Sequence, residues 1–230
     1  MKKKNKKIEK NSRKNWMEEF KVREKAGQEL KNRDVAEFMR HAGTEDCKHF
    51  LTEHGICEEA QIVLVDFRDP ELLLFAFEQE HTTWEEKALI AFFQKKDFKL
   101  IGKFLKNHHI LYDEAEVVLI KECHKAYTGK HHDPYVSGVI SNYLENRTLS
   151  DDAELELAKT GETEWIKIYA ERYQFLPEAE VELCKRGEPE LIYYYRNRYE
   201  LCEEAVEELK KRKDYDDIIS YTDDDETYTL

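Results

Sequence analysis

One 26-residue unit occurs three times in succession near the C-terminus, and this repetition limits the possible folds more than any other feature. The three copies cover residues 149–174, 175–200 and 201–226. Each copy carries a small anchor residue after two acidic or capping residues. The anchors, together with three that continue the frame toward the N-terminus, are Ala60, Ala88, Ala115, Ala153, Ala179 and Ala205. A recurring segment of this length is typical of stacked repeat proteins.

Apolar residues recur at fixed distances from each anchor. The residues four positions after the anchors are Leu64, Phe92, Leu119, Leu157, Leu183 and Leu209. Thirteen positions after the anchors, allowing for one insertion, lie Leu73, Ile101, Ile140, Ile166, Ile192 and Ile218. Sixteen positions after them lie Ala76, Phe104, Tyr143, Tyr169, Tyr195 and Tyr221. Residues four apart share a helix face, so each unit predicts two helices that each have one apolar side.

Glycine and proline mark the break between the two helices and the start of the next unit. Gly161 and Gly187 lie where a helix should end, while Pro177 and Pro189 suit the first turn of a helix. A helical hairpin with one apolar side can bury that side only against its neighbours. We therefore predict an all-α protein, an α-α superhelix (α-solenoid) of about six 26-residue helical hairpins.

The organisation along the chain follows from this frame. We expect a disordered basic arm over residues 1–15, and an N-terminal helical cap, possibly a degenerate repeat, over 16–55 with Phe38 and Phe50 in matching places. The repeat array should cover 56–222, with an insertion near 122–134, and an acidic tail should follow over 223–230. The insertion holds Cys123, His124, His131 and His132, but their spacing fits no standard metal site, so we expect a solvated loop without metal.

Units such as PEAEVELCKRGEPELIYYYRNRYE resemble the HEAT-like α-α superhelical repeat proteins, in particular uncharacterised bacterial proteins with short repeats. The resemblance covers about 165–190 residues, and the unit is shorter than a typical HEAT repeat. It implies that the protein binds other macromolecules, and it brings no functional residue that could be transferred by motif.

Composition and charge exclude several classes of protein. The longest apolar-rich run, residues 72–77, is far too short to span a membrane, and no apolar segment follows the basic N-terminus as in a signal peptide. The five cysteines are scattered and odd in number, which favours reduced thiols and a cytoplasmic location. Residues 1–14 carry +7 of the net charge of −13, so the rest of the chain carries −20 and should repel nucleic acid.

Equivalent positions of stacked units should form ladders, and one ladder near the ends of the second helices is polar. The position nineteen after the anchor holds Gln79, Asn107, Asn146, Arg172 and Arg198. Tyr193 and Tyr194 fall off the apolar face of their helix, and exposed tyrosine beside arginine is typical of protein-recognition hot spots. We predict that Tyr193, Tyr194, Arg172, Arg198, Asn146 and Asn107 bind a partner. The alternative is that Asn and Arg merely favour helix C-termini.

Glutamates of the first helices point to a second surface. We expect Glu116, Glu154, Glu156, Glu180, Glu182 and Glu208 to face solvent as an acidic stripe. Such a stripe is either an ordinary solvated face or a patch for a basic partner.

Motifs typical of enzymes are absent: the chain contains no GxGxxG, GxxxxGK[ST], HExxH or GxSxG. We predict no enzymatic activity and no cofactor. The leading hypothesis is a scaffold for an unknown protein or peptide partner, and a polar residue, Asp217, in the last unit favours a monomer. The alternatives are a nucleic-acid-binding repeat protein, as HEAT-like repeats occur in alkylpurine DNA glycosylases, and metal or ligand binding at the insertion.

Overall fold

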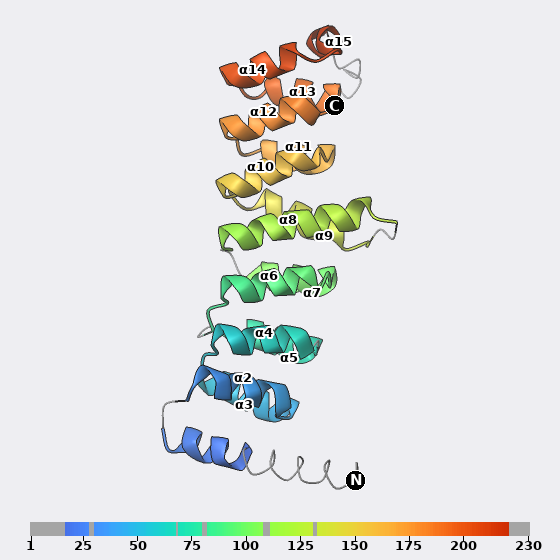
Figure 1. Cartoon of the computed structure of the whole chain (residues 1–230). Coiled ribbons are helices and arrows are strands. Elements are labelled where there is room, and N and C mark those ends of the chain that lie inside the picture. Colours follow the sequence, from blue (N-terminus) through green and yellow to red (C-terminus); the bar gives the residue numbers. More distant parts are fainter. Residues whose placement is uncertain are drawn as a thin grey trace, which may run out of the picture. The chain divides into compact units, whose positions relative to one another are not determined.

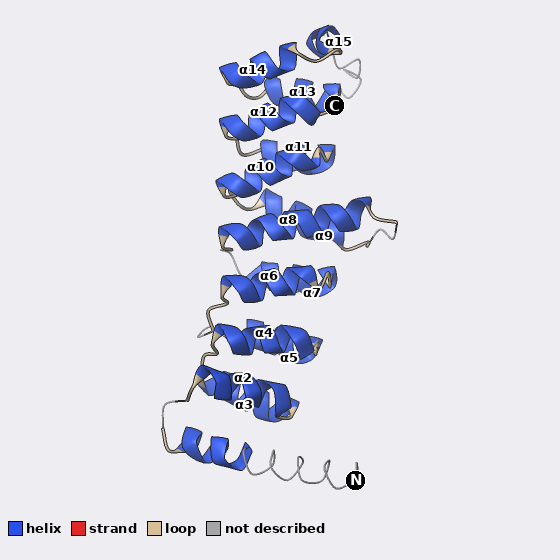
Figure 2. Cartoon of the chain, viewed as in Figure 1, coloured by secondary structure: helices blue, strands red, loops and turns tan. Residues whose placement is uncertain are grey.

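A computed structural model describes residues 17–27, 30–67, 69–79, 82–107, 111–130 and 133–220 (Figure 1). The predicted basic arm and acidic tail, as well as Tyr221, His131 and His132, lie outside these residues. Every regular element in the described part of the chain is a helix, and no strand occurs there (Figure 2). The all-α class is thus confirmed. The chain divides into two units, Met1–His109 and Ile110–Leu230, which are described separately.

The N-terminal unit alternates helices between two layers. After a helix over residues 17–25 come α2 (Asn32–His41), α3 (Thr44–Glu53), α4 (Glu58–Phe67), α5 (Pro70–Phe77), α6 (Glu86–Gln94) and α7 (Phe98–Asn107). Contacts run from α2 to α4 to α6, and separately from α3 to α5 to α7. The core between the layers is aromatic: Phe77 packs against Trp84, Phe92 and Phe104, with ring centroids 4.6 to 5.0 Å apart.

The C-terminal unit repeats this arrangement. Its helices are α8 (Asp113–Thr128), α9 (Val136–Glu145), α10 (Asp151–Thr160), α11 (Thr163–Ala170), α12 (Pro177–Arg186), α13 (Pro189–Arg196), α14 (Glu203–Lys210) and α15 (Tyr215–Ser220). One layer contains α8, α10, α12 and α14 in successive contact, and the other contains α9, α11, α13 and α15. We call these the first and second layers of the unit.

The sequence offsets correspond to the buried faces. All six anchors and all their partners four and thirteen residues later are buried, as are the five described residues sixteen positions after them. Gly161 ends α10 with a left-handed backbone (φ 68°), a conformation that strains any residue with a Cβ atom. Pro177 and Pro189 lie in the first turns of α12 and α13, as predicted.

The insertion differs from the prediction. Residues 122–128 are not a solvated loop but the last turns of α8, the longest helix in the described part of the chain. The apolar face of α8 continues through Cys123, which is fully buried, and Tyr127 packs on Trp165 with ring centroids 5.2 Å apart. The extra turns are helical because they cover the start of α11.

The predicted acidic stripe is wrong because half of its glutamates are buried. Glu116, Glu154 and Glu180 are 6%, 4% and 1% exposed. Each lies next to an anchor alanine, on the side of the first helix that faces the second layer. The other three are partly buried and form ion pairs: Glu156 with Lys121, Glu182 with Lys185 and Arg186, and Glu208 with Lys211.

Three equivalent Glu–Tyr pairs connect the two helices of a hairpin, and the same buried glutamates also reach the next hairpin. The pairs are Glu116–Tyr143, Glu154–Tyr169 and Glu180–Tyr195, with hydroxyl-to-carboxylate distances of 2.5, 2.5 and 2.8 Å. The second oxygen of each carboxylate accepts the N–H of the N-cap residue of the following first-layer helix: Ser150, Leu176 or Cys202, at 2.7 to 2.9 Å. The two hydrogen-bond donors to each carboxylate offset the free-energy cost of burying its charge.

The N-terminal unit meets the same need with an amide. Gln61 follows the anchor Ala60 and is fully buried. Its Oε1 accepts the N–H of Glu85, the N-cap residue of α6, at 2.8 Å. Position sixteen is Ala76, which has no hydroxyl to donate, and the Gln61 amide nitrogen instead donates to the carbonyls of Ile56 and Thr83. In these four hairpins, glutamate is therefore present where a tyrosine hydroxyl donates to it, and glutamine where the facing residue is Ala76.

Candidate functional site

Tyr194 lies at the centre of the predicted contact residues. It is on α13, in the second layer of the C-terminal unit, and its side chain is partly buried. The guanidinium of Arg198 covers its ring at 4.0 Å from the centroid, and Nζ of Lys167, on α11, lies 5.4 Å from the centroid. Contacts of this kind attract the cations to the π face of the ring. Burial raises the pKa of Tyr194, so its hydroxyl is neutral and can donate or accept a hydrogen bond.

An ion pair holds Lys167 beside Tyr194. Lys167 Nζ lies 2.5 Å from Glu190 Oε1 and so links α11 to α13. The hydrogen bond to Glu190 raises the pKa of Lys167. Lys167 therefore stays charged beside Tyr194 while its positive charge is already balanced.

Tyr193 faces a different neighbour. The guanidinium of Arg196 lies 5.3 Å from its ring centroid and donates to the carbonyl of Ile219 on α15 at 3.0 Å. Tyr193 is thus associated with α15 and Tyr194 with α11. The two adjacent tyrosines, which the sequence pairs as contact residues, therefore have different neighbours.

Arg172 and Arg198 occupy the same position in adjacent hairpins, directly after α11 and α13. Both are exposed. Within the described part of the chain, neither guanidinium forms an ion pair or a hydrogen bond, and the stacking of Arg198 on Tyr194 is their one side-chain interaction. The exposed acids Glu171 and Glu200 lie beside them in sequence. Because α11 packs against α13, the two arginines occupy equivalent positions in adjacent hairpins. We call Arg172, Arg198 and Tyr194 the Arg–Tyr surface.

The amides of the ladder do not belong to this surface. Asn146 donates through Nδ2 to the carbonyl of Asn142 at 2.9 Å, and Gln79 donates to that of Phe75 at 2.9 Å. Both therefore cap the C-termini of their own helices, as the alternative interpretation predicts. Asn107 is exposed at the end of α7 in the N-terminal unit. Of the predicted contact residues, Arg198 lies on the ring of Tyr194, and Arg172 occupies the equivalent position one hairpin earlier.

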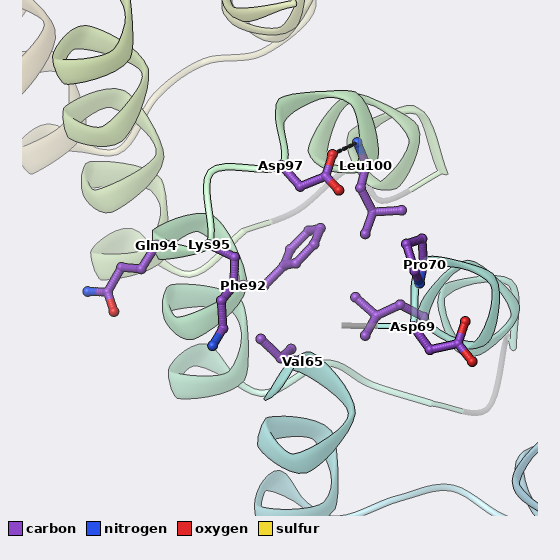
Figure 3. A pocket seen from close by; sticks show the side chains of 9 residues that line it. Val65, Asp69, Pro70, Phe92, Gln94, Lys95, Asp97 and Leu100 are labelled. Atoms are coloured by element: carbon purple, nitrogen blue, oxygen red, sulfur yellow. Dashed lines mark hydrogen bonds between the residues drawn. The ribbon is translucent and has the colours of Figure 1, made fainter. Parts of the chain in front are cut away.

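A pocket in the N-terminal unit could not be foreseen from sequence. It measures about 320 Å³, and its lining residues are Val65, Asp69, Pro70, Leu73, Phe92, Gln94, Lys95, Asp97 and Leu100 (Figure 3). The two aspartates accept backbone N–H groups at the starts of α5 and α7, and Lys95 pairs with Asp66 at 2.7 Å. The charged rim is thus already engaged, and the pocket offers mainly apolar surface.

None of the cysteines has the environment of a nucleophile. Burial raises the pKa of Cys47 to about 11 and that of Cys184 to about 12, and it also raises the pKa of Cys123, Cys57 and Cys202. A nucleophilic cysteine needs the opposite shift, toward the thiolate at neutral pH.

Sequence reasoning missed the Glu–Tyr pairs, although a signal was present. A glutamate directly follows the anchor in each hairpin that has tyrosine sixteen positions later and is described: Glu116, Glu154 and Glu180. The sequence pattern predicts that a glutamate next to a core alanine is solvated. The hydrogen-bond donors that allow its burial come from other segments and meet it only when the helices pack.

Comparison with known proteins adds no relative: no protein-family model, no curated protein and no solved structure matches this chain. No helix among the described residues is both long and apolar enough to cross a membrane.

Proposed function

We propose that this protein is a non-enzymatic scaffold that binds a partner protein or peptide through the Arg–Tyr surface. The proposed framework is an α-α superhelix of about six 26-residue hairpins, similar to HEAT-like repeats. Three features support it: the common frame of anchors, the layered helix contacts within each unit, and the buried glutamates that accept backbone N–H groups of the following hairpin in the C-terminal unit. We further propose a cytoplasmic location and a monomeric state.

The observation that carries the proposal is the pair of arginines without acidic partners. The chain beyond residue 14 has a net charge of −20, so carboxylates are plentiful, yet neither Arg172 nor Arg198 pairs with one among the described residues. A guanidinium binds a carboxylate through two parallel hydrogen bonds. Tyr194 adds a rigid aromatic surface beside Arg198. This combination favours an acidic segment of a partner protein.

The test compares three versions of the full-length protein. Each is purified from its native cells at low salt after cross-linking, and bound proteins are quantified by mass spectrometry. The double variant Arg172→Ala/Arg198→Ala removes two charges from the Arg–Tyr surface. The matched control Lys185→Ala/Arg186→Ala removes two charges from α12 in the first layer, where both side chains pair with Glu182.

We expect one stoichiometric partner that is retained by the wild type and the control and reduced at least tenfold by the double variant. A tenfold loss corresponds to about 1.4 kcal/mol, a modest effect for two interface arginines. Equal recovery with all three proteins would place the contact elsewhere and refute the role of this surface.

The same preparation tests nucleic-acid binding, the alternative function suggested by the basic arm and the Arg172/Arg198 end. Binding that rests on phosphate contacts strengthens as salt is lowered. RNA or DNA recovered with the wild type and lost with the double variant would favour the alternative. Nucleic acid lost only on deletion of residues 1–15 would instead identify the arm as an electrostatic tether.

A further inference from the structure

A second cluster, in the N-terminal unit, combines three side chains that suit a metal ion. One ligand atom from each of Glu24, Glu53 and His54 lies within 4.8 Å of the other two. Glu24 belongs to the helix over residues 17–25, while Glu53 ends α3 and His54 follows it. Two separate helices therefore contribute to the cluster.

Core packing holds these two helices together next to the cluster. Phe20 is fully buried and stacks on Phe38, with ring centroids 4.5 Å apart, and it also contacts Phe50 at 5.9 Å. Glu24 lies one helical turn after Phe20, and His54 lies one turn after Phe50. The imidazole of His54 rests against Phe50, with ring centroids 4.7 Å apart. The aromatic contacts thus fix the spacing of the polar residues.

Within the described residues, the ion-pair partners of the two carboxylates are imidazoles: His54 beside Glu24, and His49, whose Nε2 lies 3.9 Å from Glu53 Oε1. The side chain of Glu24 is only 11% exposed, and its ion-pair partner is His54, whose Nε2 lies 3.4 Å from Glu24 Oε1. Within the described part of the chain, no lysine or arginine forms an ion pair with Glu24 or Glu53. The nearby cations Lys21 and Arg23 pair instead with Asp46 and Asp34. Two carboxylates this close repel each other unless a cation lies between them.

The ligand types indicate which cation fits. Imidazole nitrogen with carboxylate oxygen suits Zn²⁺ and related transition metals, whereas Mg²⁺ and Ca²⁺ prefer oxygen ligands alone. Three protein ligands leave one position of a tetrahedral zinc ion open to water. A divalent ion also neutralises the two carboxylates.

We propose that Glu24, Glu53 and His54 bind one transition-metal ion of the zinc class. The ion would tie the helix over residues 17–25 to α3, because its ligands come from both. This inference is independent of the Arg–Tyr surface, which lies in the other unit.

The test uses the full chain without a histidine tag, stripped of metal and titrated with Zn²⁺ by calorimetry. We expect one equivalent to bind, and His54→Ala, Glu24→Gln and Glu53→Gln each to weaken binding at least tenfold, since the loss of even an outer-shell partner costs 10- to 100-fold. The matched control is His41→Ala, because His41 also faces a carboxylate, with its Nε2 3.2 Å from Glu37 Oε2. This control should keep wild-type affinity within twofold.

Three results would overturn the proposal. The first is wild-type affinity in all three ligand variants. The second is an equal loss of affinity in His41→Ala, which would mean that exposed histidine–carboxylate pairs bind zinc generically. The third is a thiolate-to-metal absorption band on loading with Co²⁺, which would place the ion on cysteines. Glu53 is exposed, so Glu53→Gln keeps the test valid if His54→Ala fails to fold.

Discussion

Replacing Glu154 by glutamine tests whether the buried glutamates stabilise their own hairpin and its contact with the next one. Glu154 accepts the hydroxyl of Tyr169 at 2.5 Å and the N–H of Leu176 at 2.9 Å. Glutamine has one oxygen for these two donors, and its amide nitrogen must face the other donor. One donor loses its acceptor and a new buried N–H group has none, each at a cost of about 1–3 kcal/mol.

The neutral amide also removes an opposing cost. Burial raises the pKa of Glu154 despite the two donors, so the ionised carboxylate carries a desolvation penalty in the folded protein. Relief of this penalty offsets part of the loss, and we expect Glu154→Gln to lower the free energy of unfolding by about 1–3 kcal/mol. Urea unfolding followed by far-ultraviolet circular dichroism measures this change.

The control is Glu156→Gln, two residues along the same helix. Glu156 is partly buried and pairs with Lys121 at 3.5 Å, a contact whose loss should cost less than about 0.5 kcal/mol. In a Tyr169→Phe background no hydroxyl competes for the acceptor, so the penalty of Glu154→Gln should fall by about 1 kcal/mol. If Glu154→Gln and Glu156→Gln destabilise the protein equally, or the Tyr169→Phe background leaves the penalty unchanged, the pairs are not a source of stability.

Two further predictions follow from backbone geometry and burial. Gly161→Ala should lower the free energy of unfolding by about 1 kcal/mol, because φ at Gly161 is 68°. Gly138→Ala, inside α9 with free space around the added methyl group, should raise the free energy of unfolding by about 0.5–1 kcal/mol. If thermal unfolding shows that both variants are stabilised, or that both are destabilised, the different roles of the two glycines are contradicted. In alkylation of the native protein at pH 8 followed by mass spectrometry, the partly exposed Cys57 and Cys202 should react before the buried Cys47, Cys123 and Cys184, whose raised pKa keeps them protonated. Faster labelling of any buried cysteine would show that its helices open readily.

The sequence predicts the structure best at the apolar positions of the repeat. Alanine at the anchor and the aliphatic or aromatic residues at the later offsets are buried at every described position, since a helical period allows one placement of such residues. The sequence predicts a loop at the insertion because most of its residues are polar, but the apolar face of α8 continues there through Cys123. Among the predicted contact residues, Arg198 stacks on Tyr194, Asn146 caps its own helix, and Arg196 lies between Tyr193 and a carbonyl of α15.

The amino-acid sequence by itself determined the helices, their ends and the faces that they bury, because helical periodicity, glycine with positive φ and proline in first turns are local properties of the chain. Tertiary structure alone decided the role of the charged and polar groups. Whether a glutamate is solvated, as expected for Glu154, or buried against a tyrosine and a backbone N–H depends on donors that lie 15 to 22 residues away. The meeting of Glu24 with His54 likewise depends on how two helices pack. The free energy of a charge is set by its neighbours in space, and those neighbours are absent from any local pattern.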